Sequence, residues 1–169
     1  IKLILKKKLI NTVYSVDLNN EMLSFAKKKF INQKIKFIKA NAEKLPFQNN
    51  YFDKYIISFC LRNITNINKS INEAYRILKP GGIFYCLEFS TPESNIIDSM
   101  YKNYKKNIIP WIGAKVTNNQ KAYKYLDESI DLFPNQERLL NKIKEIGFIE
   151  CNYINIFNGI VTVHKGFKV

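Results

Sequence analysis

Residues 55–89 read YIISFCLRNITNINKSINEAYRILKPGGIFYCLEF, in which one helical pattern separates two apolar runs. The first run, Tyr55 to Leu61, is continuous, as in a central parallel strand that is covered on both faces. Apolar residues then recur at helical spacing from Asn66 to Leu78, and Pro80-Gly81-Gly82 ends the helix. The second run, Ile83 to Phe89, is again typical of a buried strand. This stretch therefore predicts two parallel strands joined by a helical crossover.

The same alternation continues toward the N-terminus. Ile1 to Ile10 fits the end of an amphipathic helix, Thr12 to Val16 is a short β-favouring run, and Ile35 to Ala40 returns to a strand pattern. Between these two strands we expect a helix capped by Asn19 or Asn20. Its buried stripe should consist of Met22, Leu23, Ala26 and Phe30.

Toward the C-terminus, residues 94–132 are rich in Tyr, Lys and Asn and predict an insertion of short helices. Gln136 to Ile146 predicts an amphipathic helix, and Ile149 to Phe157 and Ile160 to Phe167 predict two strands. The dipeptide Asn158-Gly159 between these strands signals a hairpin. The expected fold class is α/β, with a mostly parallel sheet that ends in an antiparallel hairpin at one edge.

Length and composition indicate a single globular domain over residues 1–169. The chain has 169 residues, close to one domain of about 150, and 46% of them are hydrophobic. No apolar stretch approaches the roughly 18 residues that span a bilayer. The three cysteines, Cys60, Cys86 and Cys151, form no CxxC pair and lie in apolar runs, which indicates reduced thiols in the core.

The charge is strongly basic, since 27 Lys+Arg against 14 Asp+Glu give +13. Such a charge suggests nucleic acid or an anionic membrane surface as a partner. Arginine, however, which is preferred for bidentate phosphate and guanine contacts, occurs only as Arg62, Arg76 and Arg138. Lys, Asn and Ile are abundant throughout, as expected from AT-rich coding DNA rather than from a selected binding face. Nucleic acid is therefore the weaker hypothesis for a partner.

The first residue with chemical interest is Asp17, which stands where a strand ends and a helix begins. An acidic residue at this position can accept hydrogen bonds from both ribose hydroxyls of a nucleoside cofactor, and such ligands bind beyond the carboxyl ends of the strands. The alternative is an aspartate in an ordinary strand-to-helix turn.

Further motifs follow Asp17-Leu-Asn-Asn-Glu-Met22 in order along the chain. They are Ala40-Asn41-Ala42-Glu43-Lys44-Leu45-Pro46-Phe47, Ser58-Phe-Cys-Leu-Arg62-Asn63, Leu78-Lys-Pro80-Gly81-Gly82, Leu87-Glu88-Phe89-Ser90, Tyr125-Leu-Asp-Glu-Ser129 and Gly159-Ile-Val-Thr-Val-His164-Lys-Gly166. Together they resemble the class I S-adenosylmethionine-dependent methyltransferases and, more narrowly, the UbiE family of ubiquinone/menaquinone C-methyltransferases. The resemblance covers essentially the whole chain and implies a Rossmann-like class I methyltransferase sheet.

The resemblance implies S-adenosyl-L-methionine as the cofactor and assigns four residues to it. Asp17 is then the ribose ligand, Asn41 and Ala42 address the adenine edge, and Ser58 lines the cofactor site. Ser58 could also be a small packed residue whose hydroxyl is satisfied internally. Sulfonium alkylation needs no metal, and the sequence has no cluster with metal-ligand spacing.

Arg62 is the candidate catalytic residue, because the resemblance gives the matching arginine a part in initiating transfer. A guanidinium keeps its proton in proteins, so we expect Arg62 to stabilise a quinol phenolate or to orient a water base. The alternative is an arginine that caps the strand end through Asn63 or Glu88. His164, the only histidine, lies in an apolar strand and is expected to be structural.

The implied reaction is C-methylation of a polyprenyl benzoquinol, or of demethylmenaquinol. The stretch Tyr101 to Tyr104 with Ile108, Ile109 and Trp111 would line a pocket for the prenyl tail or pack in the core of an inserted helix. Alternatives are a class I methyltransferase that acts on RNA or another small molecule, and a non-catalytic scaffold of a quinone-biosynthesis complex. Class I enzymes carry their first strand and a Gly-rich loop before the position of Ile1, so we expect the first strand to be missing from this chain and residues upstream to supply both.

The substrate also suggests where the protein works, since a polyprenyl quinol is confined to a membrane. We expect peripheral contact with the matrix side of the mitochondrial inner membrane for a eukaryotic source, and with the membrane from the cytoplasm for a bacterial one. A quinone-biosynthesis complex or a homodimer is a further expectation.

Overall fold

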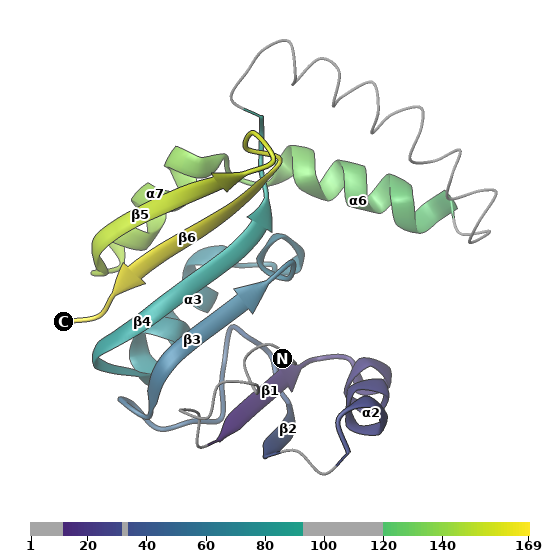
Figure 1. Ribbon diagram of the computed structural model, residues 1–169, viewed down its shortest axis with the longest axis vertical. Helices are drawn as coiled ribbons and strands as arrows, with labels where there is room; N and C mark the ends of the chain where they lie inside the picture. Colours follow the sequence, from purple (N-terminus) through teal and green to yellow (C-terminus); the bar gives the residue numbers. More distant parts are fainter. Residues whose placement is uncertain (1–11, 32–33, 93–119) are drawn as a thin grey trace. The chain divides into compact units, whose positions relative to one another are not determined.

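The computed structural model describes residues 12–31, 34–92 and 120–169. The chain divides into two compact units, Ile1–Pro46 and Phe47–Val169. The described strands form one two-stranded sheet and one four-stranded sheet (Figure 1). The alternation of strands and helices confirms the α/β class.

In the first unit, strand β1 (Val13–Asp17) pairs in parallel with β2 (Ile35–Lys39), and helix α2 (Asn20–Lys29) connects them. Asn19 caps α2, as expected, because its Oδ1 accepts the N–H groups of Glu21 and Met22 over 2.7 and 3.3 Å.

The buried stripe predicted for α2 is wrong in one position. Leu23 is buried, but Met22 is 56% exposed. The two residues lie about 100° apart around the helix, and a sheet of two strands is too narrow to cover both directions.

The four-stranded sheet has the order β3-β4-β6-β5. Strands β3 (Phe52–Ser58) and β4 (Leu78–Phe89) are parallel, whereas β6 (Val161–Phe167) runs antiparallel to both β4 and β5 (Ile149–Ile156). The hairpin turn between β5 and β6 has positive φ at Asn158 (55°) and Gly159 (89°), the conformation that favours this dipeptide. The predicted C-terminal antiparallel hairpin is therefore confirmed.

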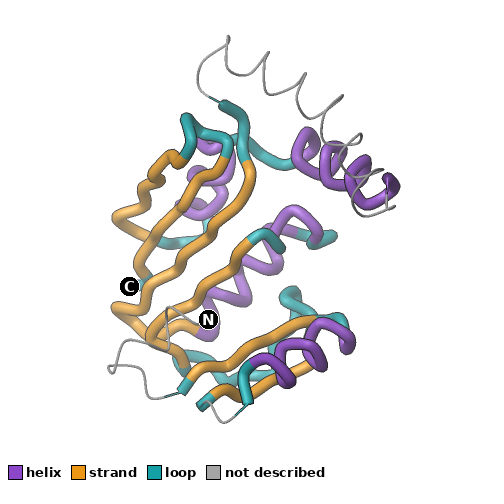
Figure 2. The backbone as a smooth tube through the Cα atoms, turned by 45° about the vertical axis from the view of Figure 1, so that its right-hand side comes forward, coloured by secondary structure: helices purple, strands orange, loops and turns teal. Residues whose placement is uncertain are grey.

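The described residues of this second unit form helices α3 (Ile67–Ile77), α6 (Gln120–Leu132) and α7 (Gln136–Glu145), together with a 3-10 turn, η1 (Leu61–Asn63). Helices α3 and α7 cover one face of the sheet (Figures 1 and 2). Their apolar residues form one core with the inward side chains of β3 and β4. This core includes Ile57, Leu61, Ile71, Ala74, Leu78, Phe84, Cys86, Leu139, Ile143 and Phe148.

The position of β3 corrects the prediction of a central strand that is covered on both faces. In the part of the chain that the structure describes, β3 pairs with β4 alone and forms an edge of its sheet. Ile56 is therefore 52% exposed, while its neighbour Ile57 points into the core. The strand also ends at Ser58, three residues earlier than the apolar run.

The Pro80-Gly81-Gly82 segment lies inside β4 rather than between a helix and a strand, because α3 already ends at Ile77. Gly81 has a φ of 75°, a value that suits glycine. Its N–H donates to the carbonyl of Lys168 over 2.8 Å, and the N–H of Lys168 donates to Gly82 over 2.9 Å. The segment thus anchors the C-terminal end of the chain.

Several expectations fall on residues 1–11 and 93–119, which lie outside the described residues. They include the first amphipathic helix, most of the insertion and the aromatic stretch around Trp111. Of the cysteines, Cys86 is buried as expected, but Cys60 is exposed because it lies beyond the end of β3. Among the described helices, none has the length and apolarity needed to cross a membrane.

Candidate active site

The carboxyl ends of β3 and β4 lie at the same edge of the four-stranded sheet, since the two strands are parallel. Ser58, the last residue of β3, is exposed there. The N–H of Phe59 donates to the carbonyl of Leu87 over 2.9 Å, after which the chain turns into η1. Leu61 is 1% exposed and anchors this turn in the core. The anchor places Arg62 next to the end of β4.

Arg62 forms an ion pair with Glu88, a residue of β4. Its Nη1 lies 2.9 Å from Glu88 Oε2, and the two side chains are 10% and 2% exposed. Oε1 of Glu88 accepts the backbone N–H of Arg62 over 3.3 Å, and Oε2 accepts that of Phe89 over 3.1 Å. The guanidinium also lies over the ring of Phe89, 5.3 Å from its centroid. These contacts hold the guanidinium in one place and compensate two buried charges.

One polar atom of this arrangement has no partner. Nε of Arg62 is buried and forms no hydrogen bond within the described part of the chain. A buried donor without a partner is costly, about 1–3 kcal/mol, and is rare in folded proteins. The fold therefore leaves one N–H of Arg62 unused.

A second contact comes from α6. The hydroxyl of Tyr125 donates to Oδ1 of Asn63 over 3.0 Å, although the two residues are 62 positions apart. This bond joins α6 to the turn that carries Arg62. Residues of three motifs, Leu-Arg-Asn, Leu-Glu-Phe-Ser and Tyr-Leu-Asp-Glu-Ser, thus meet at this edge of the sheet.

In the first unit, Asp17 and Asn41 stand at the carboxyl ends of β1 and β2. The N–H of Ala40 donates to the carbonyl of Asp17 over 3.1 Å, so the residues after β2 lie beside Asp17. Oδ1 of Asp17 accepts the N–H of Asn19 over 2.8 Å, and Oδ1 of Asn41 accepts that of Glu43 over 2.8 Å. Ala42, between Asn41 and Glu43, is partly buried. These bonds orient both side chains.

The remaining polar groups of this edge suit a nucleoside. Oδ2 of Asp17 and the amide NH2 of Asn41 form no hydrogen bonds among the described residues. This leaves one carboxylate oxygen as an acceptor and one amide NH2 group as a donor at the carboxyl ends of β1 and β2. Leu18, directly after Asp17, is 62% exposed and offers an apolar surface of the kind that a flat base covers.

The structure thus brings Asp17, Asn41 and Ala42 together in the first unit, and Ser58 and Arg62 at one edge of the second. The sequence pointed to Glu88 only as a possible capping partner of Arg62 and not as a site residue. Glu88 lies at the end of a strand otherwise filled with apolar residues, and a buried carboxylate at such a position needs a partner.

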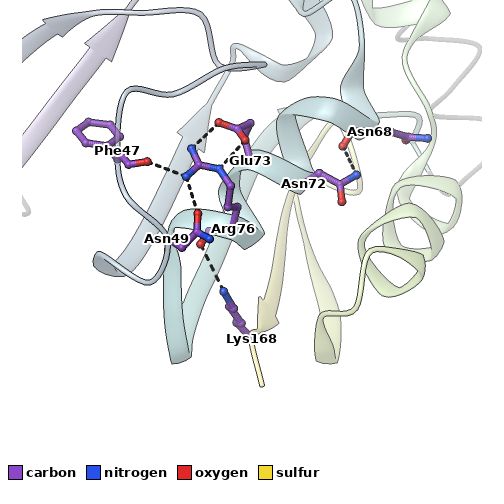
Figure 3. A network of polar contacts seen from close by, with 7 residues as sticks. All are labelled: Phe47, Asn49, Asn68, Asn72, Glu73, Arg76 and Lys168. Carbon is purple, nitrogen blue, oxygen red and sulfur yellow. Dashed lines mark hydrogen bonds and ion pairs between the residues drawn. The ribbon is translucent and has the colours of Figure 1, made fainter.

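The opposite end of the second unit holds another arginine, Arg76, in a network that Figure 3 shows. Its Nη1 donates to the carbonyl of Phe47 over 2.7 Å and to Oδ1 of Asn49 over 2.9 Å. Its Nε and Nη2 donate to Glu73 over 2.7 and 2.8 Å. Every nitrogen of this guanidinium has a partner within the fold, so the network is structural. Arg62 differs in the Nε that the fold leaves unused.

Comparisons with known proteins agree with this picture. The family model described as the ubiE/COQ5 methyltransferase family matches residues 1–168. The chain is similar to the ubiquinone/menaquinone biosynthesis C-methyltransferase UbiE of Rickettsia bellii, with 51% identity over 157 residues. That match covers 90% of this chain and 63% of the relative, so the chain spans less than two thirds of the length of the relative.

Solved structures share the fold at low identity. An S-adenosylmethionine-dependent methyltransferase of Thermotoga maritima has a TM-score of 0.68 at 19% identity, covering 93% of this chain and 73% of that one. The [4+2]-cyclase SpnF has a TM-score of 0.70 at 13% identity, covering 99% of this chain and 69% of that one. Because a cyclase shares the fold, the fold alone does not decide the reaction.

Proposed function

Because this chain belongs to the ubiE/COQ5 methyltransferase family, we propose that it acts in transferring a methyl group from S-adenosyl-L-methionine to a ring carbon of a polyprenyl benzoquinol or of demethylmenaquinol. The observation that carries this proposal is the family match over nearly the whole chain. The buried Arg62–Glu88 pair supports it, since it supplies a rigid donor at the edge of the sheet where ligands bind.

S-adenosyl-L-methionine would supply an electrophilic methyl group, and Asp17, Asn41 and Ala42 would hold its nucleoside. The carboxylate of Asp17 would accept a hydrogen bond from the ribose, and Asn41 with the backbone of Ala42 would bond the adenine edge. Ser58, exposed at the end of β3, would line the cofactor site. The donors and acceptors that these residues leave unused within the fold support the assignment.

Arg62 would act on the quinol. The ring carbon becomes a better nucleophile when the neighbouring hydroxyl carries negative charge, and a guanidinium N–H stabilises that phenolate by a charge-assisted hydrogen bond. S-adenosyl-L-methionine would supply the methyl group, whose bond to sulfur would break as the new C–C bond formed, and the ring proton would pass to water. The protein's main contribution would be orientation and close approach of the two reactants.

The substrate class sets the proposed location and partners. A prenyl tail keeps the quinol in a bilayer, so the protein would contact the membrane surface peripherally, and the net charge of +13 would favour anionic lipid. We also propose association with other enzymes of quinone biosynthesis or as a homodimer, because such a substrate passes between proteins at one surface.

The test uses a completed protein, in which residues of the Rickettsia bellii relative that the match leaves uncovered extend this chain. The completed protein is incubated with S-adenosyl-L-methionine, a reductant and a short-tailed benzoquinol or demethylmenaquinol. We expect a product heavier by one methylene unit, with the new methyl group on a ring carbon. Methylation of neither quinol, by a protein that binds the cofactor, would contradict the proposal.

A further inference from the structure

Arg62 is held in a way that distinguishes two of its guanidinium nitrogens, Nη1 and Nε. Nη1 bonds the carboxylate of Glu88, and the guanidinium plane rests over Phe89. Nε, the guanidinium nitrogen that joins the group to the aliphatic part of the side chain, is buried and has no partner among the described residues.

A structural ion pair in the same unit shows the contrast. Glu73 engages Arg76 through two oxygens, one on Nε and one on Nη2. In Glu88, by contrast, Oε1 accepts the backbone N–H of Arg62. Oε2 accepts both the Nη1–H of Arg62 and the backbone N–H of Phe89. The carboxylate of Glu88 therefore meets the side chain of Arg62 at Nη1 alone, whereas Glu73 meets Arg76 at two nitrogens. Nε of Arg62 therefore has no hydrogen-bond partner among the described residues, although the carboxylate of Glu88 bonds the same guanidinium.

We propose that Glu88 is the positioning residue for Arg62, fixing the guanidinium so that its Nε–H remains the hydrogen-bond donor for an oxygen of the bound substrate. This inference rests on the proposed function, in which that oxygen is the quinol hydroxyl or phenolate. Glu88 itself is 1% exposed and acts through Arg62 without touching the substrate.

Burial and charge explain why such a device is useful. A hydrogen bond in a buried site is stronger than the same bond in water, but a single buried guanidinium would be costly. Glu88 offsets that cost and leaves the pair neutral overall. The Nε–H can then stabilise charge that develops on a substrate oxygen, from a fixed direction and without rearrangement during the reaction.

The test is a double-mutant cycle in the completed protein, with Glu88→Gln, Arg62→Lys and the double variant. Glu88→Gln keeps the shape and removes the charge, and Arg62→Lys keeps a charge and removes the Nε–H. We expect each single change to lower kcat about tenfold or more, with the Kd for S-adenosyl-L-methionine unchanged within about twofold. The double variant should be no slower than Arg62→Lys, since Glu88 works through Arg62.

The matched control is Glu73→Gln, the same change in the other arginine pair, which should leave kcat unchanged within about twofold. Losses that multiply in the double variant would overturn the positioning role, because they would mean that Glu88 and Arg62 act independently. If Glu88→Gln fails to fold, Glu88→Asp replaces it: this variant keeps the charge but draws it back, and an unchanged kcat would equally overturn the proposal.

A second measurement separates this inference from the proposed function. The Nε–H signal of Arg62 is identified in a 15N spectrum of the completed protein by its loss in Arg62→Lys. We expect added 2-methoxyphenol to shift that signal, and to shift it less in Glu88→Gln. A protein that methylates no quinol but shows this shift would defeat the proposed function and leave the positioning role standing. If the Nε–H signal of Arg62 does not shift when the phenol is added, the positioning role is overturned.

Discussion

The hydroxyl of Tyr125 donates a hydrogen bond to Oδ1 of Asn63 over 3.0 Å, and this bond links α6 to the turn that carries Arg62. Tyr125→Phe removes only that bond. We expect kcat of the completed protein to fall about fivefold, which corresponds to the roughly 1 kcal/mol of one neutral hydrogen bond. The thermal midpoint should barely change, because Tyr125 is 55% exposed.

Tyr153→Phe is the control for this variant. Its hydroxyl donates to Glu137 over 2.7 Å, so the same chemical group is lost at a place far along the chain from the turn. We expect its kcat to equal that of the unmodified protein. Equal losses in the two tyrosine variants would mean that the link between α6 and η1 has no part in turnover.

Arg76→Met tests the network at the other end of the second unit. The arginine joins α3 to the segment before β3 through four hydrogen bonds to Glu73, Phe47 and Asn49, and its side chain is 31% exposed. Its loss should lower the free energy of unfolding by about 1–2 kcal/mol, read from urea denaturation, with little change in kcat.

Lys79→Met is the matched comparison, because Lys79 pairs with Asp53 over 2.8 Å on the surface, where the side chains are 46% and 82% exposed. An exposed pair contributes about 0–1 kcal/mol, so this variant should be the more stable of the two. If both changes cost the same, the bonds of Arg76 to the backbone and to Asn49 add nothing to stability.

His164 predicts a pH dependence of stability. It is 2% exposed, its Nε2 lies 2.9 Å from the carbonyl of Gln136, and burial lowers its pKa from the usual 6.5, against the opposing effects of that hydrogen bond and of Glu137. The folded state therefore prefers the neutral imidazole. As pH falls below about 6.5, the unfolded chain takes up the proton first, so stability is lost.

The measurement is unusually clean, because the chain has one histidine. In a protein made of this chain alone, a single imidazole signal should titrate below pH 6.5 by NMR. The free energy of unfolding should decrease as the pH is lowered from about 7 to about 5. His164→Gln keeps a donor for Gln136 and should flatten this slope. A titration midpoint above the usual value would contradict the assignment.

Sequence analysis predicted the elements well because their signals are local. Asn19 caps α2 as predicted, since an asparagine before an apolar stripe satisfies the first N–H groups of a helix. Asn158 and Gly159 form the hairpin turn, since they tolerate positive φ. The predictions of burial for Ile56 and Met22 were wrong, because burial at these positions depends on how many strands lie beside them. The periodicity of the sequence carries no information on that number.

For the candidate site, the sequence predicted which residues stand at the ends of strands but not which contacts their side chains make. Motifs at strand ends pointed to Asp17 and Asn41 in the first unit and to Ser58 and Arg62 in the second, because parallel strands of a sheet place their carboxyl ends at one edge of that sheet. Their roles in binding and catalysis stay predictions. The sequence left two roles open for Arg62, and the structure shows that the contact with Glu88 is made. The sequence could not predict that Nε of Arg62 has no partner. Which nitrogen of Arg62 bonds which oxygen of Glu88 depends on how the side chains pack.

Asp17→Asn tests the proposed ribose ligand without disturbing its fold. Oδ1 of Asp17 accepts the N–H of Asn19, and an asparagine side chain still offers that acceptor. The charge is lost, however, and charge-assisted hydrogen bonds to a ligand are worth about 1.5–3 kcal/mol. In the completed protein we expect the Kd for S-adenosyl-L-methionine to rise about tenfold or more by calorimetry.

Asn19→Ala provides the complementary control, since it removes the cap of α2 while keeping the carboxylate. Oδ1 of Asn19 accepts two N–H groups, so its loss should lower the free energy of unfolding by about 1 kcal/mol. Cofactor affinity should change much less than in Asp17→Asn, because the ribose contact survives. If the two variants weaken binding equally, Asp17 acts on the cofactor only by shaping the turn into α2, and the ribose assignment falls.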